Sequence, residues 1–141
     1  MQLCLRANER YGFLFVANYH DVPNAGKIRM VLPGESRPTT FPAHGKIVLG
    51  KRRCSMLPLN VPLGRDDRIR YATAEVLEAS AKPGRTTLVV AGTADAEAEV
   101  ELVTTATKAW LDGKPLPAKR LGRRLRLRFG LTGGRQTLGV R

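Results

Sequence analysis

The chain has 141 residues, a length that suits a single domain with its own core. Its 24 lysines and arginines outnumber 12 acidic residues, and the formal net charge of +12 would attract phosphates, acidic lipids or an acidic protein surface. No apolar run approaches the roughly 18 residues of a membrane helix, and no signal peptide is recognisable. We therefore expect no membrane partner; the compartment is open, with the cytoplasm favoured.

Short alternating or apolar runs, separated by turn residues, recur along the whole chain. They cover residues 2–6, 12–19, 26–32, 45–50, 68–79, 85–92, 98–105, 107–111, 123–131 and 135–140. The one rival helix is the Ala- and Glu-rich run 72–82, which lacks an amphipathic stripe and a cap, so we predict a strand there. Asp112 and Gly113 between apolar flanks predict a tight hairpin.

Many short strands with no helices to cross between them predict antiparallel pairing. We therefore predict one all-β domain over residues 1–141. It should be an antiparallel β-sandwich with Greek-key or jelly-roll-like connections and little or no helix.

Chemistry-bearing motifs are sparse. Residues 45–51 fit the phosphate-loop pattern G-x-x-x-x-G-K, but their composition is that of a strand, and Arg52 stands where a magnesium-binding Ser or Thr belongs. His20 and His44 are far apart, and Cys4 and Cys54 have no cysteine nearby, so neither a metal site nor a disulfide is expected. No serine lies in a nucleophile elbow. We expect no cofactor, no catalytic residue and no enzymatic activity.

Two basic segments form a candidate polyanion face. The first is the run Lys51, Arg52 and Arg53; the second is the strand 123–131, in which Arg124, Arg126 and Arg128 share one side. Single-strand binders interleave aromatics with basic residues, whereas Phe129 alternates to the opposite side. Nucleic acid is therefore a disfavoured partner.

An acidic strand offers a simpler role for the second segment. Glu97, Glu99 and Glu101 share one side of residues 96–103, so they could face the three arginines across the solvent side of one sheet. Each such exposed pair is worth about 0.2–1 kcal/mol.

The strand 12–19 is apolar on both sides. Phe13, Phe15 and Tyr19 point one way, and Leu14 and Val16 the other, so both sides should be covered. The second cover is the loop 31–45, a second copy of the chain, or another domain. Phe13, Phe15 and Tyr19 therefore form a candidate docking or carbohydrate face.

Three segments carry a resemblance to a known family. They are "GKIVLGKRRCSMLPLNVPLG" (45–64), "IRYATAEVL" (69–77) and "RTTLVVAGTADAEAEVEL" (85–102). They resemble, in order, parts of the β-sandwich domain that follows the catalytic barrel in family 35 glycoside hydrolases, the β-galactosidases. "YGFLFVANYHD" (11–21) resembles the strand that opens that domain.

The resemblance covers roughly residues 3–102 and implies a non-catalytic accessory domain, because the catalytic glutamates of these enzymes belong to the barrel. The implied role is structural packing beside the barrel of a parent glycoside hydrolase. The implied partner is that barrel or a second copy of the chain. The alternative is a stand-alone binding module for carbohydrate or, more weakly, for nucleic acid or other polyanions.

Overall fold

The computed structural model describes every residue from 1 to 141 and contains sixteen strands and no helix. The all-β prediction is confirmed, including a strand rather than a helix over Glu75–Lys82. The strands are β1 Gln2–Ala7, β2 Gly12–Asn18, β3 Asn24–Gly26, β4 Ile28–Val31, β5 Pro38–Phe41, β6 Ile47–Leu49, β7 Arg53–Pro62, β8 Arg68–Ala72, β9 Glu75–Lys82, β10 Arg85–Ala91, β11 Glu97–Val103, β12 Ala109–Leu111, β13 Lys114–Leu116, β14 Ala118–Leu121, β15 Arg124–Gly130 and β16 Gln136–Val140. No segment is a helix with the length and apolar character needed to cross a membrane.

The strands form an antiparallel sandwich. A seven-stranded sheet has the order β1-β2-β7-β8-β11-β15-β14, and a five-stranded sheet has the order β13-β12-β16-β10-β9. Two small pairs, β3 with β6 and β4 with β5, complete the fold. The links from β10 to β11, β11 to β12, β13 to β14 and β15 to β16 all pass between the two large sheets, as in a jelly roll.

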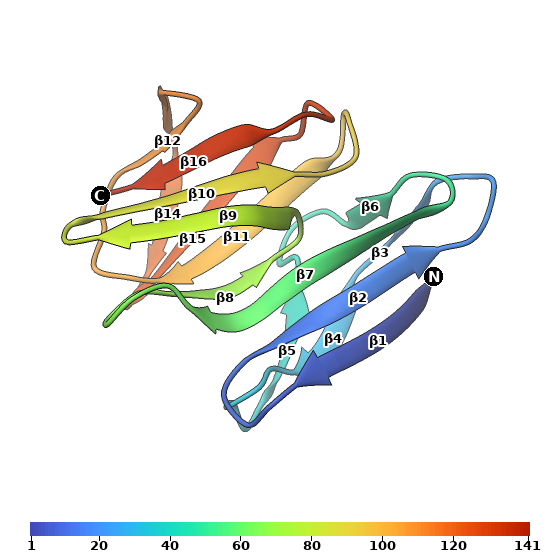
Figure 1. Ribbon diagram of the computed structural model, residues 1–141, viewed down its shortest axis with the longest axis horizontal. Helices are drawn as coiled ribbons and strands as arrows, with labels where there is room; N and C mark the ends of the chain where they lie inside the picture. The colour runs from blue at the N-terminus through green and yellow to red at the C-terminus, as the bar shows by residue number, and fades with distance from the viewer.

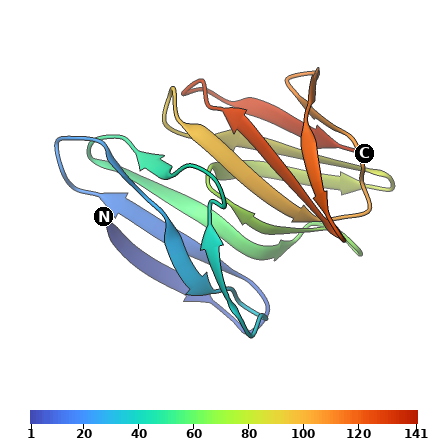
Figure 2. The ribbon, with the colours of Figure 1, turned by 180° about the vertical axis from the view of Figure 1, so that it is seen from behind.

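The seven-stranded sheet changes layer along its width (Figures 1 and 2). On one side of Figure 1, β1, β2 and β7 lie in front of β3, β4 and β5; on the other, β11, β15 and β14 lie behind β9, β10 and β16. β8 joins the two halves. The two halves of this sheet therefore have opposite faces buried in the interior.

Two hydrophobic clusters result. The first, between the large sheets, includes Val100, Leu127 and Leu138; the second, between β2, β7 and the segment 28–49, includes Val16, Leu57 and Phe41. The segment 31–45 thus covers the Leu14 and Val16 side of β2. The side that carries Phe13 and Phe15 remains partly exposed.

A β-bulge in β8 reverses the alternation of its side chains. Glu101 pairs with Tyr71 and Leu102 pairs with Ile69, so Arg70 is an extra residue in the ladder. Ile69 and Ala72 consequently belong to the first cluster although they are three residues apart. Arg70 donates to Glu101 and Tyr71 donates to Glu99, on the face of the sheet that points away from the first cluster.

Two local predictions are confirmed. Asp112 and Gly113, with φ values of 50° and 79°, connect β12 to β13 in the left-handed conformation that a two-residue hairpin requires. Residues 47–49 form a strand and not a phosphate loop. Cys4 and Cys54 are both exposed and unbonded.

The β1–β2 hairpin depends on a close approach at Gly12. A Cβ added there would lie 2.5 Å from the Ala7 Cβ, whereas one added at Gly26 would meet nothing within 4 Å. We expect Gly12→Ala to lower the free energy of unfolding by about 1–3 kcal/mol through overpacking, and Gly26→Ala to change it little. Urea denaturation measures both. Equal midpoints for the two variants would contradict this packing.

Candidate functional site

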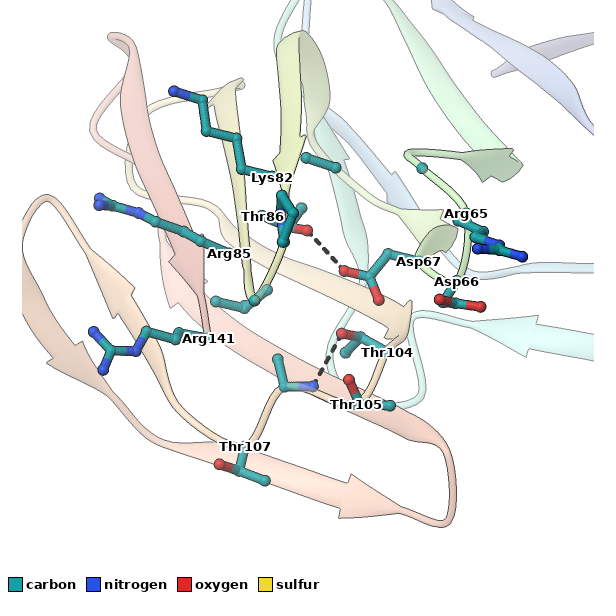
Figure 3. A pocket seen from close by; sticks show the side chains of 16 residues that line it. Arg65, Asp66, Asp67, Lys82, Arg85, Thr86, Thr104, Thr105, Thr107 and Arg141 are labelled. Carbon is teal, nitrogen blue, oxygen red and sulfur yellow. Dashed lines mark hydrogen bonds between the residues drawn. The ribbon is translucent and has the colours of Figure 1, made fainter.

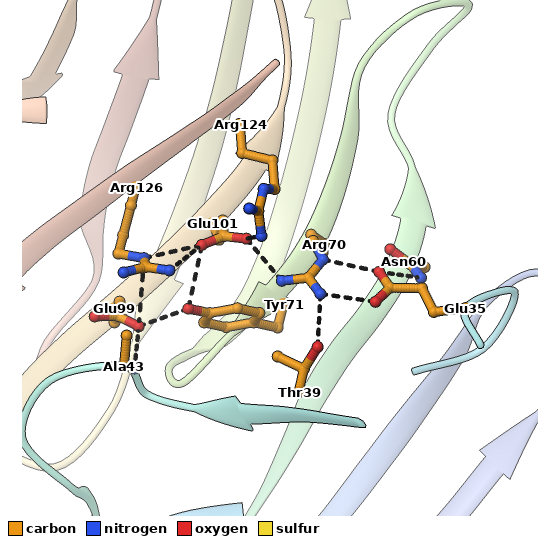
Figure 4. Close-up of polar contacts among 10 residues, drawn as sticks. All are labelled: Glu35, Thr39, Ala43, Asn60, Arg70, Tyr71, Glu99, Glu101, Arg124 and Arg126. Carbon is orange, nitrogen blue, oxygen red and sulfur yellow. Dashed lines mark hydrogen bonds and ion pairs between the residues drawn. The ribbon is translucent and has the colours of Figure 1, made fainter. Parts of the chain in front are cut away.

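A fully buried carboxylate lies at the centre of the seven-stranded sheet (Figure 4). Glu101 has no exposure to water, and three arginines surround it. Arg70 Nη1 lies 2.8 Å and Arg124 Nη1 3.2 Å from its Oε1, and Arg126 Nη2 lies 2.7 Å from its Oε2. Both carboxylate oxygens are therefore neutralised by charge-assisted hydrogen bonds.

Arg70 connects this centre to the segment that precedes β5. Its Nη2 lies 2.7 Å from Glu35 Oε2 and donates to Thr39 Oγ1 at 2.6 Å. Asn60 on β7 donates to the Pro33 carbonyl at 2.6 Å and to Glu35 Oε1 at 3.3 Å. The segment 31–45 is thus fastened to the sheet by polar contacts as well as by the second hydrophobic cluster.

Tyr71 and Glu99 form the other side of the network. The Tyr71 hydroxyl donates to Glu99 Oε1 at 2.6 Å, and the Ala43 amide donates to the same oxygen at 2.6 Å. Burial, with Glu99 and Glu101 alongside, raises the pKa of the Tyr71 phenol far above its ordinary value. The phenol therefore stays protonated and acts as a hydrogen-bond donor.

The oppositely charged groups of the network favour each other's ionised form. Burial alone would raise the pKa of Glu35, but the hydrogen bonds and charge of Arg70 outweigh it and hold that pKa below its ordinary value. Burial likewise opposes ionisation of Arg70 and Arg126, yet their carboxylate partners raise both pKa values. Glu35, Arg70 and Arg126 are therefore charged at neutral pH.

The predicted pairing of the acidic and arginine strands is confirmed, but its predicted exposure is wrong. β11 pairs with β15 so that Glu101 faces Arg126 and Glu99 faces Arg128 across the ladder. Glu99 is only 2% exposed and Glu101 is fully buried, because the segment 31–45 covers this part of the sheet. Only Glu97, which bonds Arg128 at 2.8 Å, keeps the expected exposed position.

The six residues of the candidate polyanion face lie in two places. Arg124, Arg126 and Arg128 are on β15 and are all ion-paired. The other three surround the start of β7, with β8 and β11 between them and β15. There Arg52 pairs with Asp21 at 2.6 Å, whereas Lys51 and Arg53 are exposed without an ion pair.

The outer face of β2 is partly exposed, so covering of both sides within one chain is not observed. Phe15 is 41% exposed, Phe13 is half-buried, and Tyr19, just beyond the strand, is 70% exposed. Phe15 lies between Cys4 on β1 and Met56 on β7 in the ladder, and Met56 is 39% exposed. We define Cys4, Phe13, Phe15 and Met56 as the β2 outer face.

A cleft of about 450 Å³ opens at one end of the sandwich (Figure 3). It is lined by the β7–β8 turn, the β9–β10 turn, residues 104–107 and the C-terminus. Its cations have no ion pair; they are Arg65, Lys82, Arg85 and Arg141. Asp67 accepts a hydrogen bond from the Thr86 hydroxyl at 2.8 Å. The cleft thus suits an anion better than a cation.

A second hollow, of about 310 Å³, lies on the outer face of the five-stranded sheet. It is lined by Trp110, Thr87, Thr137 and Gly139, and it shares Arg85 and Arg141 with the cleft. We call it the Trp110 trough. No group of three His, Cys, Asp or Glu side chains in the structure could hold a metal ion.

Sequence reasoning missed both the buried network and the trough. Arg70 and Tyr71 share a face only because of the bulge, which strict alternation does not reveal. The trough depends on Gly139 standing beside Trp110, so only knowledge of the strand pairing could have found it. No protein-family model matches the chain, and no curated protein matches it.

Removing the central carboxylate should be far more costly than removing an exposed one. Glu101→Ala leaves buried arginine charge uncompensated, and we expect it to lower the free energy of unfolding by about 3–5 kcal/mol. Glu97→Ala, which removes an exposed pair on the same strand, should cost less than about 1 kcal/mol. Chemical denaturation measures the difference. Similar losses in both variants would show that the buried network does not stabilise the fold.

Acid should weaken the attachment of the segment 31–45. The folded-state pKa of Glu35 is lowered, so its stabilising contribution is present above its ordinary value of 4.5 and is lost as the pH falls through the folded value. Glu35→Gln cannot ionise. We expect this variant to be less stable than the parent at pH 7, and its stability to decline less steeply below pH 4.5. Parallel stability profiles from urea denaturation between pH 7 and pH 3 would contradict this.

Proposed function

We propose that the chain is a non-catalytic accessory β-sandwich that packs through its β2 outer face against the catalytic barrel of a glycoside hydrolase. The observation that carries this proposal is the exposed apolar row on that face. Phe15 and Met56 are neighbours on adjacent strands, and they are 41% and 39% exposed. Segments 11–21, 45–64, 69–77 and 85–102, which resemble the family 35 accessory domain, include both residues.

The row differs from scattered apolar surface residues, which are common on proteins. Phe13 continues it along β2, and Cys4 extends it onto β1. Aromatic and methionine side chains are enriched at protein interfaces, and burial of apolar surface contributes about 25 cal/mol per Å². A sheet surface of this composition suits a protein partner.

The state of the carboxylates supports a non-catalytic role. Glu99 and Glu101 are buried, and their oxygens are occupied by arginines, a tyrosine and a backbone amide. Hydrolysis of a glycoside requires two carboxyl groups on either side of an accessible sugar bond. These two groups instead hold the sandwich together.

The test is a binding measurement with the catalytic barrel of a family 35 β-galactosidase encoded in the same genome, prepared without its own sandwich domain. We expect a complex in sedimentation velocity that Phe15→Asp weakens at least about tenfold, a loss of roughly 1.4 kcal/mol. Val31→Asp is the matched control, since Val31 is 48% exposed but lies on β4, outside the β2 outer face. Circular dichroism verifies that both variants fold.

Two results would overturn the proposal. One is the absence of a complex, or a complex that both variants bind equally well. The other is a homodimer of the chain alone that Phe15→Asp dissociates, which would assign the β2 outer face to a second copy.

A further inference from the structure

The Trp110 trough is built by one row of residues across three strands. Trp110 on β12 pairs with Gly139 on β16, and Gly139 pairs with Thr87 on β10. Their chain neighbours Leu138 and Leu88 are in the first hydrophobic cluster, so this row lies on the outer face. Gly139 leaves the floor open, because a Cβ there would meet nothing within 4 Å.

The trough also has polar and cationic groups without partners. The hydroxyls of Thr87 and Thr137 make no hydrogen bond within the chain, and neither Arg85 nor Arg141 is ion-paired. Figure 3 shows the two guanidinium groups extending toward the same side, away from Asp66 and Asp67. An aromatic wall, an open floor, free hydroxyls and two free cations therefore converge.

We propose that the Trp110 trough binds a saccharide that carries a negative charge, either a carboxylate or a sulfate. The indole packs against the apolar C–H face of a sugar ring over Gly139, and the threonine hydroxyls bond sugar hydroxyls. Arg85 and Arg141 hold the anionic group, because the planar guanidinium matches carboxylate and sulfate oxygens. The volume of about 310 Å³ lies within the range of ligand pockets.

The arrangement favours a sugar over a nucleic acid. Proteins that bind single strands stack successive bases on several aromatic side chains along a basic track. Here one aromatic ring stands alone, and its other cross-strand neighbour is Pro115. The remaining lining is small and hydroxylated, which suits the many hydroxyl groups of a saccharide.

The trough carries its own reporter, because Trp110 is the only tryptophan in the chain. Tryptophan fluorescence is titrated with tetragalacturonate, with a sulfated β-1,4-galactotetraose and with the neutral β-1,4-galactotetraose. We expect a saturable change with at least one acidic probe and at least about tenfold weaker binding of the neutral one, since hydrogen bonds to charged groups are worth about 1.5–3 kcal/mol. The two acidic probes distinguish carboxylate from sulfate.

Filling the floor should abolish the site without disturbing the fold. Gly139→Val is expected to weaken acidic-probe binding at least tenfold. Gly130→Val is the matched control, since Gly130 lies on β15, where a Cβ also meets nothing within 4 Å. Arg85→Ala and Arg141→Ala should lower the affinity for the acidic probe to that of the neutral one. Circular dichroism and thermal unfolding verify that each variant is folded.

Three results would overturn the proposal: no saturable fluorescence change with either acidic probe, equal binding by Gly139→Val and Gly130→Val, or a single-stranded oligothymidylate that binds as tightly as the acidic saccharides. The last would assign the trough to nucleic acid. Phe15→Asp should leave saccharide binding unchanged, since Phe15 lies on β2, outside the trough. Failure of this proposal is therefore distinguishable from failure of the docking proposal.

Discussion

A carboxylate without access to water sets the main constraint on this fold. Cations reach both oxygens of the buried Glu101 carboxylate, and without them an unpaired buried charge would cost several kcal/mol. The bulge in β8 supplies Arg70, and the register of β15 supplies Arg126. Arg70 in turn holds Glu35, so the segment 31–45 takes its position from a charge located on the opposite half of the sheet.

This polar centre also explains how the remaining surfaces are distributed. The segment 31–45 is held on the face of β2 that contains Leu14 and Val16, and is therefore not available to cover Phe15. The arginines of β15 are each ion-paired with a glutamate, which compensates part of their positive charge. Cations without an ion pair include Lys51 and Arg53 at the start of β7 and four residues around the cleft and the Trp110 trough, Arg65, Lys82, Arg85 and Arg141.

Much of the fold could be predicted because strand periodicity is local. The alternation of apolar and polar side chains predicted the strands and the pairing of the acidic strand with the arginine strand. The Asp112 and Gly113 pair predicted the hairpin. The burial of Glu99 and Glu101 could not be predicted, because it depends on where a long irregular segment folds. The same limit applies to the sites: Phe15 could be found from one strand, whereas the trough requires Trp110 and Gly139 to be neighbours, which only the pairing of β12 with β16 decides.

β8 is the one strand whose fully buried residues belong to both hydrophobic clusters, with Ile69 and Ala72 in one and Tyr71 in the other. One further contact joins the clusters: Val48 on β6 packs against the first cluster, whereas its neighbours Ile47 and Leu49 belong to the second. A change of side-chain volume in one half can therefore reach the other through β8 and β6, and the bonds of Glu99 to Ala43 and of Glu101 to Arg70 couple the halves as well. This five-residue strand must thus satisfy the packing of both halves at once, although the longest strand, the β2 outer face and the Trp110 trough all lie outside it.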